Sequence, residues 1–449
     1  MAVRLFLILS IINDWYTIQI DFVLAFPQAP AECTMYMEIP KGFEIEGAYE
    51  GEYVLLLLRN LYGGKAAGKI WFDFLKKGLL ETGFTQSKHN ECVFINEGVI
   101  LTIYVDDGIL FGPEQDKIHA QIDKLKQLGY RVDEMGDVCD YLGVKIDKLP
   151  DGRIKLTQPQ LIDQILHDLG MENKRTKPKS IPALSSKVLE RDPEGHKFEE
   201  KWSYRSIIGK LNHLEKSTRG DIAVAVHQCA RFSVDPKKSH ADAVRMIGRY
   251  LSGTRDKGII FNPDHTMSFE CYCDAGFSGD WVPTLAPFDP STARSRGGYI
   301  ISFANCPLGW KSQLQTEIAL STAEAEYISL SNALKEVIYL MCFIEEITTF
   351  GIPFNDNTKA KIKGKCFQEP VVHCKAYEDN SATLEMAKVP KMRPRTKHIN
   401  IKYHHFREHV RNGFIEVQWV DTQDQVADIL TKPLPQDLFI IHRQRFLGW

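Results

Sequence analysis

Two adjacent aspartates between two apolar runs constrain the fold of this 449-residue chain. Asp106 and Asp107 follow the β-branched and aromatic run Ile100–Tyr104, and the apolar run Ile109–Phe111 comes after them and one glycine. Short runs of this composition are typical of β-strands, so the sequence predicts a β-hairpin with acidic residues at its tip. A plain Asp-Gly turn without a chemical role is an equally simple interpretation of the same residues.

A third acid, Asp21, favours a chemical role for this hairpin. It lies in another strand-like stretch, Thr17–Phe22. If this strand ends beside the hairpin tip, three carboxylates can meet, and Mg²⁺ prefers carboxylates together with substrate phosphates as ligands. Two such ions about 4 Å apart can activate a 3′-hydroxyl group and stabilise a leaving pyrophosphate.

A second set of acids occurs beyond residue 265, each near the end of a predicted strand or helix: Asp274, Glu326, Asp379 and Asp428. The helix that contains Glu326 begins with Ser321 and Glu324, which match a capping box and give Glu324 a structural role. Glu326 lies two residues further, about 200° around the helix, and is therefore available for chemistry.

The other acids of this set have similar positions. Asp379 follows the short predicted strand Val371–Tyr377. Thr422 and Gln425 repeat the capping-box pattern, which places Asp428 about one turn inside a second helix. Each acid alone is most simply a solvated surface charge, because only the tertiary fold can bring four separate elements together.

The predicted elements divide the chain into three parts. Residues 1–112 mix strands with a helix over Lys65–Leu80, and residues 113–260 are mostly helical with a linker near 173–201. Between about residues 265 and 440, strands and helices alternate, which is typical of an α/β layer domain. We therefore predict an α/β (α+β) fold class with a helical middle part.

Composition argues against several other classes of protein. The chain has ten cysteines without a C-x-x-C pair, which speaks against a zinc ribbon and favours a reducing compartment. The apolar run Leu5–Ile12 is shorter than the ~20 residues of a membrane helix, and a buried helix is a better interpretation than a signal peptide. The net charge of −3 gives no support for nucleic-acid binding but does not exclude local basic stripes.

Several separated motifs in the first half resemble copia-type reverse transcriptases in order and spacing. They are Ile20–Phe26, Met35–Phe43, Leu61–Lys65 and Tyr104–Asp107. The resemblance implies a reverse transcriptase palm over residues 1–112 and a thumb and connection over 113–260. It also implies that Asp21, Asp106 and Asp107 bind two Mg²⁺ ions, and that Phe26 is the steric gate against a ribose 2′-hydroxyl group.

One departure from that family concerns the fingers. In the family, a basic fingers segment that holds the incoming triphosphate precedes the strand of Asp21, whereas this chain begins twenty residues before this aspartate. Positioning and electrostatics carry most of phosphoryl-transfer catalysis. We therefore expect an N-terminally truncated enzyme with little DNA polymerisation by this chain alone.

The second set of acids resembles copia-type RNase H, whose order is Asp, Glu, Asp, Asp. The surrounding motifs agree: Ala293–Tyr299, Trp310–Ser312, Lys397–Ile399 and Ala427–Lys432. The resemblance implies an RNase H-like mixed five-stranded sheet with helices over residues 265–440. It also implies that two Mg²⁺ ions, or Mn²⁺ in their place, act at these four acids to hydrolyse RNA in an RNA–DNA hybrid.

Basic residues follow Asp379 in the sequence. Arg393, Arg395 and Lys397 are candidate phosphate contacts to a bound hybrid, although a solvated basic loop explains them equally well. His405 and His409 share a helix face, but no cysteine or acid nearby completes a zinc-ligand set.

Together these patterns favour the reverse transcriptase and RNase H region of a copia-type retrotransposon Pol polyprotein, with nucleotidyltransferase and endonuclease activity. The expected partners are an RNA–DNA hybrid, an RNA template, a DNA primer, deoxynucleotides and other parts of the polyprotein, with no membrane. The expected location is a cytoplasmic virus-like particle or the nucleus, without secretion. The alternative is an inactive, degenerate transposon copy that at most binds nucleic acid.

Overall fold

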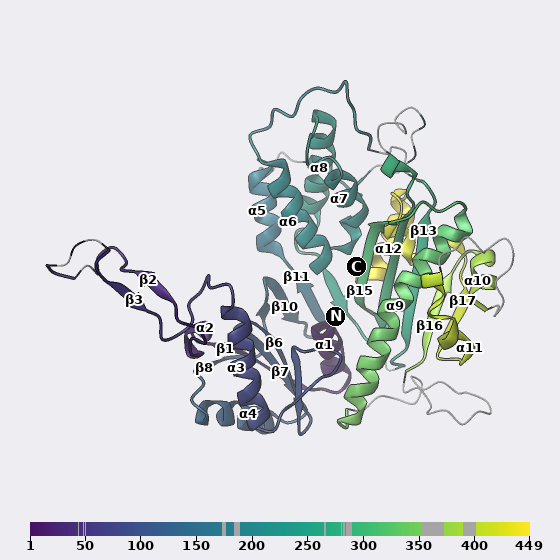
Figure 1. Cartoon of the computed structure of the whole chain (residues 1–449). Coiled ribbons are helices and arrows are strands. Elements are labelled where there is room, and N and C mark those ends of the chain that lie inside the picture. Colours follow the sequence, from purple (N-terminus) through teal and green to yellow (C-terminus); the bar gives the residue numbers. More distant parts are fainter. Residues whose placement is uncertain are drawn as a thin grey trace.

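The computed structural model describes residues 1–43, 45–47, 49, 51–172, 177–183, 189–264, 266–279, 281, 283, 290–352, 372–388 and 401–449. Two units built on sheets lie side by side, and a block of helices lies against both of them (Figure 1). The predicted α/β class is therefore confirmed for the described part of the chain.

The first sheet is antiparallel, with the strand order β4-β5-β6-β7-β1-β8. Its strands are β1 (Tyr16–Phe22), β4 (Thr85–Gln86), β5 (Val93–Asn96), β6 (Val99–Tyr104), β7 (Asp107–Gly112) and β8 (Val132–Gly136). The predicted hairpin and the predicted strand of Asp21 are thus confirmed, as β6 with β7 and as β1. The sheet also includes β8, which lies beyond residue 112.

Both faces of this sheet are covered. Helices α3 (Ala67–Glu81) and α4 (Gln115–Gln127) bury one face, since Trp71 and Ile118 belong to the same apolar cluster as Leu110. On the other face lies α1 (Ala2–Ile12), whose Phe6 ring contacts the ring of Phe111 at a centroid distance of 5.6 Å. The predicted buried N-terminal helix is therefore confirmed, and it covers this face because consecutive apolar residues of β7, such as Leu110 and Phe111, point to opposite faces of the sheet.

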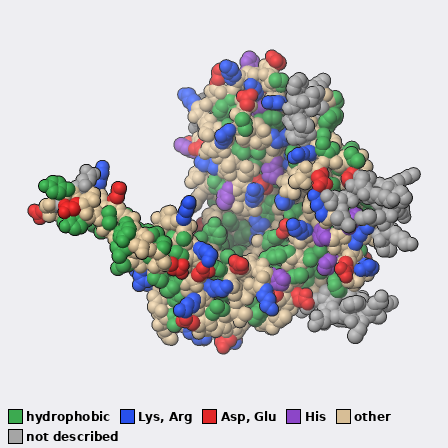
Figure 2. All heavy atoms as spheres, viewed as in Figure 1, with side chains coloured by type: hydrophobic (Ala, Val, Ile, Leu, Met, Phe, Trp, Pro, Cys, Tyr) green, Lys and Arg blue, Asp and Glu red, His purple; other side chains and the backbone are tan. Residues whose placement is uncertain are grey.

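A two-stranded hairpin projects from this unit beyond the short helix α2 (Ala25–Gln28) (Figure 1). It consists of β2 (Tyr36–Glu38) and β3 (Val54–Leu56), which pair in antiparallel fashion. Apolar side chains lie exposed along it, as Figure 2 shows, including those of Tyr36, Val54 and Leu56.

A second antiparallel sheet, of strand order β12-β11-β10-β9, connects the first unit to the helical block. Its strands are β9 (Asp140–Tyr141), β10 (Val144–Lys148), β11 (Ile154–Thr157) and β12 (Ile259–Phe261). The block contains α5 (Pro159–Asp168), α6 (Tyr204–Ser217), η1 (Gly220–Ile222), α7 (Ala223–Ala230) and α8 (Lys238–Gly253).

The third sheet has the strand order β15-β14-β13-β16-β17. Its strands are β13 (Phe269–Gly276), β14 (Arg296–Phe303), β15 (Cys306–Leu314), β16 (Cys374–Glu378) and β17 (Ile415–Trp419). The first three pair in antiparallel fashion, whereas β16 runs parallel to both β13 and β17. The predicted mixed five-stranded sheet is therefore confirmed.

Helix α9 (Thr322–Thr349) crosses this third sheet over β13 and β14 (Figure 1). Among the described residues it is long and apolar enough to cross a membrane by length and composition, but 67% of its most apolar window is buried. A helix that is apolar on most sides is expected where the core surrounds it. Its composition is therefore that of a core helix.

Shorter helices complete this unit. They are η2 (Pro290–Ala293), α10 (Ser381–Lys388), η5 (Ile401–His404), α11 (Arg407–Arg411), η6 (Thr422–Asp424), η7 (Val426–Leu430) and α12 (Gln436–Leu447). The prediction of one continuous helix beginning at Thr422 is wrong. Two separate 3₁₀ turns form there, and Gln425 caps the second by accepting a hydrogen bond from the backbone N–H of Ala427 at 3.4 Å.

Candidate metal centres

Strand register brings the first three acids together. Asp21 in β1 lies opposite Asp107 in β7, and the backbone N–H of Phe22 donates to the carbonyl oxygen of Asp106 at 2.8 Å. All three acidic side chains are half-buried. The strand that ends beside the hairpin tip is thus the one that the sequence predicted.

The turn between β6 and β7 differs from a plain Asp-Gly turn. Tyr104 pairs with Asp107, so Val105 and Asp106 form the turn. Val105 has φ 59°, which is rare for a β-branched residue and marks local backbone strain. Its carbonyl oxygen accepts a hydrogen bond from Nε1 of Trp71 in α3 at 2.6 Å, which holds the strained turn in place.

Gly108 lies outside this turn and has a packing role. A Cβ atom at this position would lie 2.9 Å from Cγ1 of Ile20 on the neighbouring strand β1. A larger residue would therefore push β1 away from β7. The glycine lets Asp21 and Asp107 face each other at the normal spacing of a sheet.

Electrostatic repulsion marks this first site. Burial, followed by the charges of Asp106 and Asp133, raises the pKa of Asp21, and burial with the charges of Asp106, Asp21 and Asp140 raises the pKa of Asp107. Asp133 lies opposite Asp21 in the pairing of β1 with β8. Sequence reasoning missed it, because nothing in the sequence indicates that β8 pairs with β1.

Phe26 lies near these acids on α2. The residue before the helix, Leu24, is in the left-handed conformation at φ 53°, which turns the chain sharply after β1. The ring of Phe26 is half-buried and contacts the ring of Tyr62 at a centroid distance of 4.6 Å. The pKa of Tyr62 is raised by burial and then by the charge of Asp106, so this aromatic pair borders the acids.

The second site is more compact. One carboxylate oxygen from each of Asp274, Glu326 and Asp379 lies within 4.8 Å of the other two. Within the described part of the chain, this trio is the one group of His, Cys, Asp or Glu that meets this distance, so Asp21, Asp106 and Asp107 are neighbours in a looser arrangement.

The third sheet and α9 position this trio. β13 and β16 run parallel with Tyr272 opposite Tyr377, so Asp274 and Asp379, two residues further along each strand, emerge at the same edge. Glu326 reaches this edge from the first turns of α9. That helix begins as predicted, because Ser321 Oγ accepts a hydrogen bond from the backbone N–H of Glu324 at 3.2 Å.

Asp428 joins the trio through Asp274. Gln425 Nε2 donates to the carbonyl oxygen of Cys273 at 2.9 Å and fixes η7 against β13. Thr431 Oγ1 donates to Asp274 Oδ2, and Lys432 Nζ lies 2.8 Å from Asp428 Oδ1. The structure therefore brings together all four acids of the second set.

Burial and the charges of neighbouring acids raise the pKa values of Glu326, Asp379 and Asp428. Burial and then the charge of Asp274 raise the pKa of Glu326 to about 11 and that of Asp428 to about 8. Burial also raises the pKa of Asp379, while a hydrogen bond from Thr422 lowers it. Glu326 Oε2 is buried without a hydrogen-bond partner. Crowded carboxylates with an unpartnered oxygen fit a hard divalent cation.

Sequence reasoning gave no role to Glu378, which precedes Asp379. Its side chain is 0% exposed, and its Oε2 atom lies 3.4 Å from the thiol Sγ of Cys273. Burial raises the pKa of Glu378 strongly. The Glu378 side chain therefore lies in the interior of this unit, beside Cys273 of β13. The period of two residues along β16 could have indicated this, since Cys374 and Ala376 are buried on the same face.

The basic stretch is only partly described. Arg393, Arg395 and Lys397 lie outside the described residues. Two further basic residues that follow Asp379 in the sequence are described: Lys402 forms an ion pair with Glu317 at 2.6 Å, and Arg407 donates to the hydroxyl group of Tyr327 at 2.9 Å.

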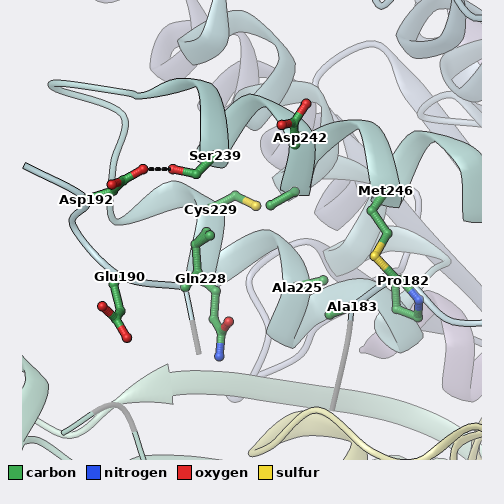
Figure 3. Close-up of a pocket in the computed structure, with 12 residues that line it drawn as sticks. Pro182, Ala183, Glu190, Asp192, Ala225, Gln228, Cys229, Ser239, Asp242 and Met246 are labelled. Atoms are coloured by element: carbon green, nitrogen blue, oxygen red, sulfur yellow. Dashed lines mark hydrogen bonds between the residues drawn. The ribbon is translucent and has the colours of Figure 1, made fainter. Parts of the chain in front are cut away.

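A cavity of about 450 Å³ lies in the helical block, and none of the seven acids lines it (Figure 3). Gln228 and Cys229 of α7 and Ser239 of α8 border it, and Ser239 Oγ donates to Asp192 Oδ2 at 2.5 Å. Residues 184–188, beside the lining residue Ala183, lie outside the described part of the chain. The cavity therefore has no assigned role.

Comparisons with known proteins identify relatives of this chain. Residues 1–185 match the family model described as reverse transcriptase (RNA-dependent DNA polymerase). Over 98% of its length the chain is 30% identical to the retrovirus-related Pol polyprotein from transposon RE1 of Arabidopsis thaliana, and likewise to that from transposon TNT 1-94 of Nicotiana tabacum. It spans only 28% and 31% of these two relatives.

A solved structure shows a weaker likeness. The foamy viral protease-reverse transcriptase in complex with RNA/DNA hybrid matches with a TM-score of 0.48 and 14% identity. The match covers 91% of this chain and 44% of that chain.

Proposed function

Because this chain is related to the copia-type Pol polyproteins of plant transposons over nearly its whole length, we propose that it is their reverse transcriptase and RNase H region. Residues 265–440 would carry the nuclease, and residues 1–112 the polymerase palm. The observation that carries the nuclease proposal is the approach of Asp274, Glu326 and Asp379 to within 4.8 Å.

In the nuclease, Asp274, Glu326 and Asp379 would hold one Mg²⁺ ion, and Asp274 with Asp428 a second, with Mn²⁺ as a substitute. When bound, such a pair of ions activates a water molecule for in-line attack and stabilises the departing 3′ oxygen of RNA. The chain contributes a rigid arrangement of oxygens, because Asp274 and Asp379 project from paired strands and α9 anchors Glu326. The substrate would be the RNA strand of an RNA–DNA hybrid.

In the palm, Asp21, Asp106 and Asp107 would hold the ions for nucleotide addition. The raised pKa values of Asp21 and Asp107 fit a site that is complete only with added positive charge. Phe26, in contact with Tyr62, would exclude a ribose 2′-hydroxyl group of the incoming nucleotide.

The experiment that tests the nuclease is hydrolysis of a labelled RNA–DNA hybrid in Mg²⁺ by the wild type and by Asp379→Asn. We expect the variant to lose at least 100-fold in rate, on the order of what loss of a ligand or of its outer-sphere support costs. Asp256→Asn, which changes an exposed acid, serves as the matched control and should cleave at the wild-type rate.

Two outcomes would contradict the proposal. Cleavage that persists in Asp379→Asn would remove the assignment of this acid. A wild-type chain that neither binds divalent cations nor cleaves the hybrid would favour the alternative of an inactive transposon copy. Primer extension with the same preparation tests the expectation of little polymerisation, with Asp106→Asn as the negative control.

A further inference from the structure

One cationic side chain reaches into the second acidic site. Lys432 follows η7, and its Nζ atom lies 2.8 Å from Oδ1 of Asp428, whose side chain is only 2% exposed. The lysine side chain itself is 44% exposed, so part of its stem lies in solvent. The preceding residue, Thr431, donates to Asp274. Two consecutive residues therefore bind the two acids proposed to share an ion.

This arrangement makes the two sides of the site unequal. The charge of Lys432 acts on Asp274, Asp379 and Asp428, whereas no ion pair to Glu326 is found among the described residues. The Glu326 oxygen that faces no partner is free to bind a cation directly. Asp428 Oδ1 also has no hydrogen-bond partner, but the ammonium group of Lys432 lies 2.8 Å from it as an ion-pair partner, where a divalent cation would need to bind.

We propose that Lys432 is the resident counter-ion of Asp428, and that a divalent cation binding between Asp274 and Asp428 must displace its ammonium group. This inference rests on the proposed nuclease function and deepens it. A lysine suits this role, because its charge lies at the end of a flexible, partly exposed side chain that can turn towards solvent. The cation at Asp274, Glu326 and Asp379 meets no such competitor, so the two ions bind in sequence with unequal affinity.

The test is calorimetric titration of the whole chain with Mn²⁺ and with Mg²⁺, in the absence of nucleic acid. We expect a tighter and a weaker binding event in the wild type. In Lys432→Met the weaker event should tighten by about fivefold to tenfold, the equivalent of one partly exposed ion pair. Lys432→Arg, which keeps the charge, should behave like the wild type.

Lys210 offers a matched control. Its Nζ atom lies 2.7 Å from Asp168 Oδ2 in the helical block, in an ion pair of similar length whose lysine is likewise partly exposed. Lys210→Met should leave both binding events unchanged. Should Lys432→Met fold poorly, as judged by circular dichroism, Lys432→Gln gives the same comparison with a polar side chain.

A second measurement locates the effect. In an Asp428→Asn background, the substitution Lys432→Met should no longer change cation affinity, because the oxygen for which both cations compete has lost its charge. If the affinity still rises tenfold in this background, Lys432 does not act through Asp428 and the proposal is overturned.

The outcomes separate this inference from the function on which it rests. A wild-type chain that binds no divalent cation contradicts the proposed nuclease. If the wild type shows two binding events and Lys432→Met shows the same two affinities, only the counter-ion role of Lys432 is overturned. Lys432→Met could also keep the cation affinity of the wild type but bind an RNA–DNA hybrid more weakly in Ca²⁺. That result would assign Lys432 to phosphate contact and would equally overturn the proposal.

Discussion

At the scale of single residues, burial sets the proton affinity of groups in this chain, including groups outside the acidic sites. His442 on α12 is 0% exposed, and neither of its ring nitrogens has a hydrogen-bond partner. Burial and then the charge of Arg445 lower its pKa from 6.5 to about 4. The folded state therefore holds this ring neutral at a pH where the unfolded chain protonates it.

The sign of the resulting pH dependence follows from this difference. Above pH 6.5 the His442 ring is neutral in both the folded and the unfolded chain, so the free energy of unfolding is not reduced by its protonation. Between pH 6.5 and about 4 the unfolded chain binds the extra proton, so stability falls as the pH falls. We expect His442 to account for a loss of about 2 kcal/mol in unfolding free energy between pH 7 and pH 5.

Urea unfolding of the wild type and of His442→Phe at these two pH values checks this prediction. The variant should lose about 2 kcal/mol less than the wild type on acidification. His196→Asn, which alters an exposed histidine, should lose as much as the wild type. Equal losses in all three proteins would mean that His442 is protonated in the folded state.

At the scale of elements, helix α3 secures the acidic hairpin between β6 and β7. Trp71 is 1% exposed, and its indole N–H is the donor to the carbonyl group of the strained residue Val105. Its ring also packs edge-on against Phe22 of β1 at 5.3 Å between centroids. One side chain thus connects both of the strands that carry the first set of acids.

We therefore predict that Trp71→Phe lowers the free energy of unfolding by about 1–2 kcal/mol, through the lost hydrogen bond and the smaller ring. The turn between β6 and β7 also loses the hydrogen bond that holds it. If the wild type extends a primer, the rate in Trp71→Phe should therefore fall by more than the loss of stability alone explains. Denaturant unfolding and primer extension on the same samples give the two readouts.

Trp419→Phe is the matched control for this prediction. Trp419 is 52% exposed and donates to Asp421 at 3.3 Å, so its substitution should change the unfolding free energy by less than about 0.5 kcal/mol. A Trp71 variant as stable as this control would show that the turn does not depend on α3.

At the scale of the whole molecule, the three parts of the chain share one continuous apolar core. That core includes Phe6 of α1, Leu211 of α6 and Leu308 of β15. Arg4 reinforces this junction, because its guanidinium group donates to the carbonyl oxygens of Leu308, Lys216 and Ser217 at 3.0, 3.1 and 2.6 Å. It also lies 4.2 Å from the ring centroid of Trp310.

Replacing Arg4 should therefore affect all parts at once. We predict that Arg4→Met lowers the free energy of unfolding by about 2–3 kcal/mol, through the loss of charged hydrogen bonds and of the cation–π contact. Arg411→Met, at an exposed site, should stay within about 0.5 kcal/mol of the wild type. Unfolding followed both by tryptophan fluorescence and by circular dichroism checks this. A variant that loses one part of the structure while the rest keeps wild-type stability would contradict a shared core.

The sequence by itself determined the kind and order of most elements near the two sites. Local apolar patterns predicted β1, the hairpin of β6 and β7, and the alternation of strands and helices beyond residue 265. These patterns also placed the seven acids near the ends of elements, because strand and helix periodicity is a property of neighbouring residues. Helix α9 begins after Ser321 for the same local reason, and Glu324 also accepts a hydrogen bond from the backbone N–H of Leu320 at 2.7 Å.

Only the tertiary structure decided which side chains meet. The parallel pairing of β13 with β16 brings Asp274 to Asp379, and the pairing of β1 with β8 adds Asp133 to the first site. The contact of Lys432 with Asp428 depends on the same assembly. Strand order and register arise from the burial of whole faces against distant partners. For that reason, no local pattern could indicate how closely the acids approach or which cation balances them.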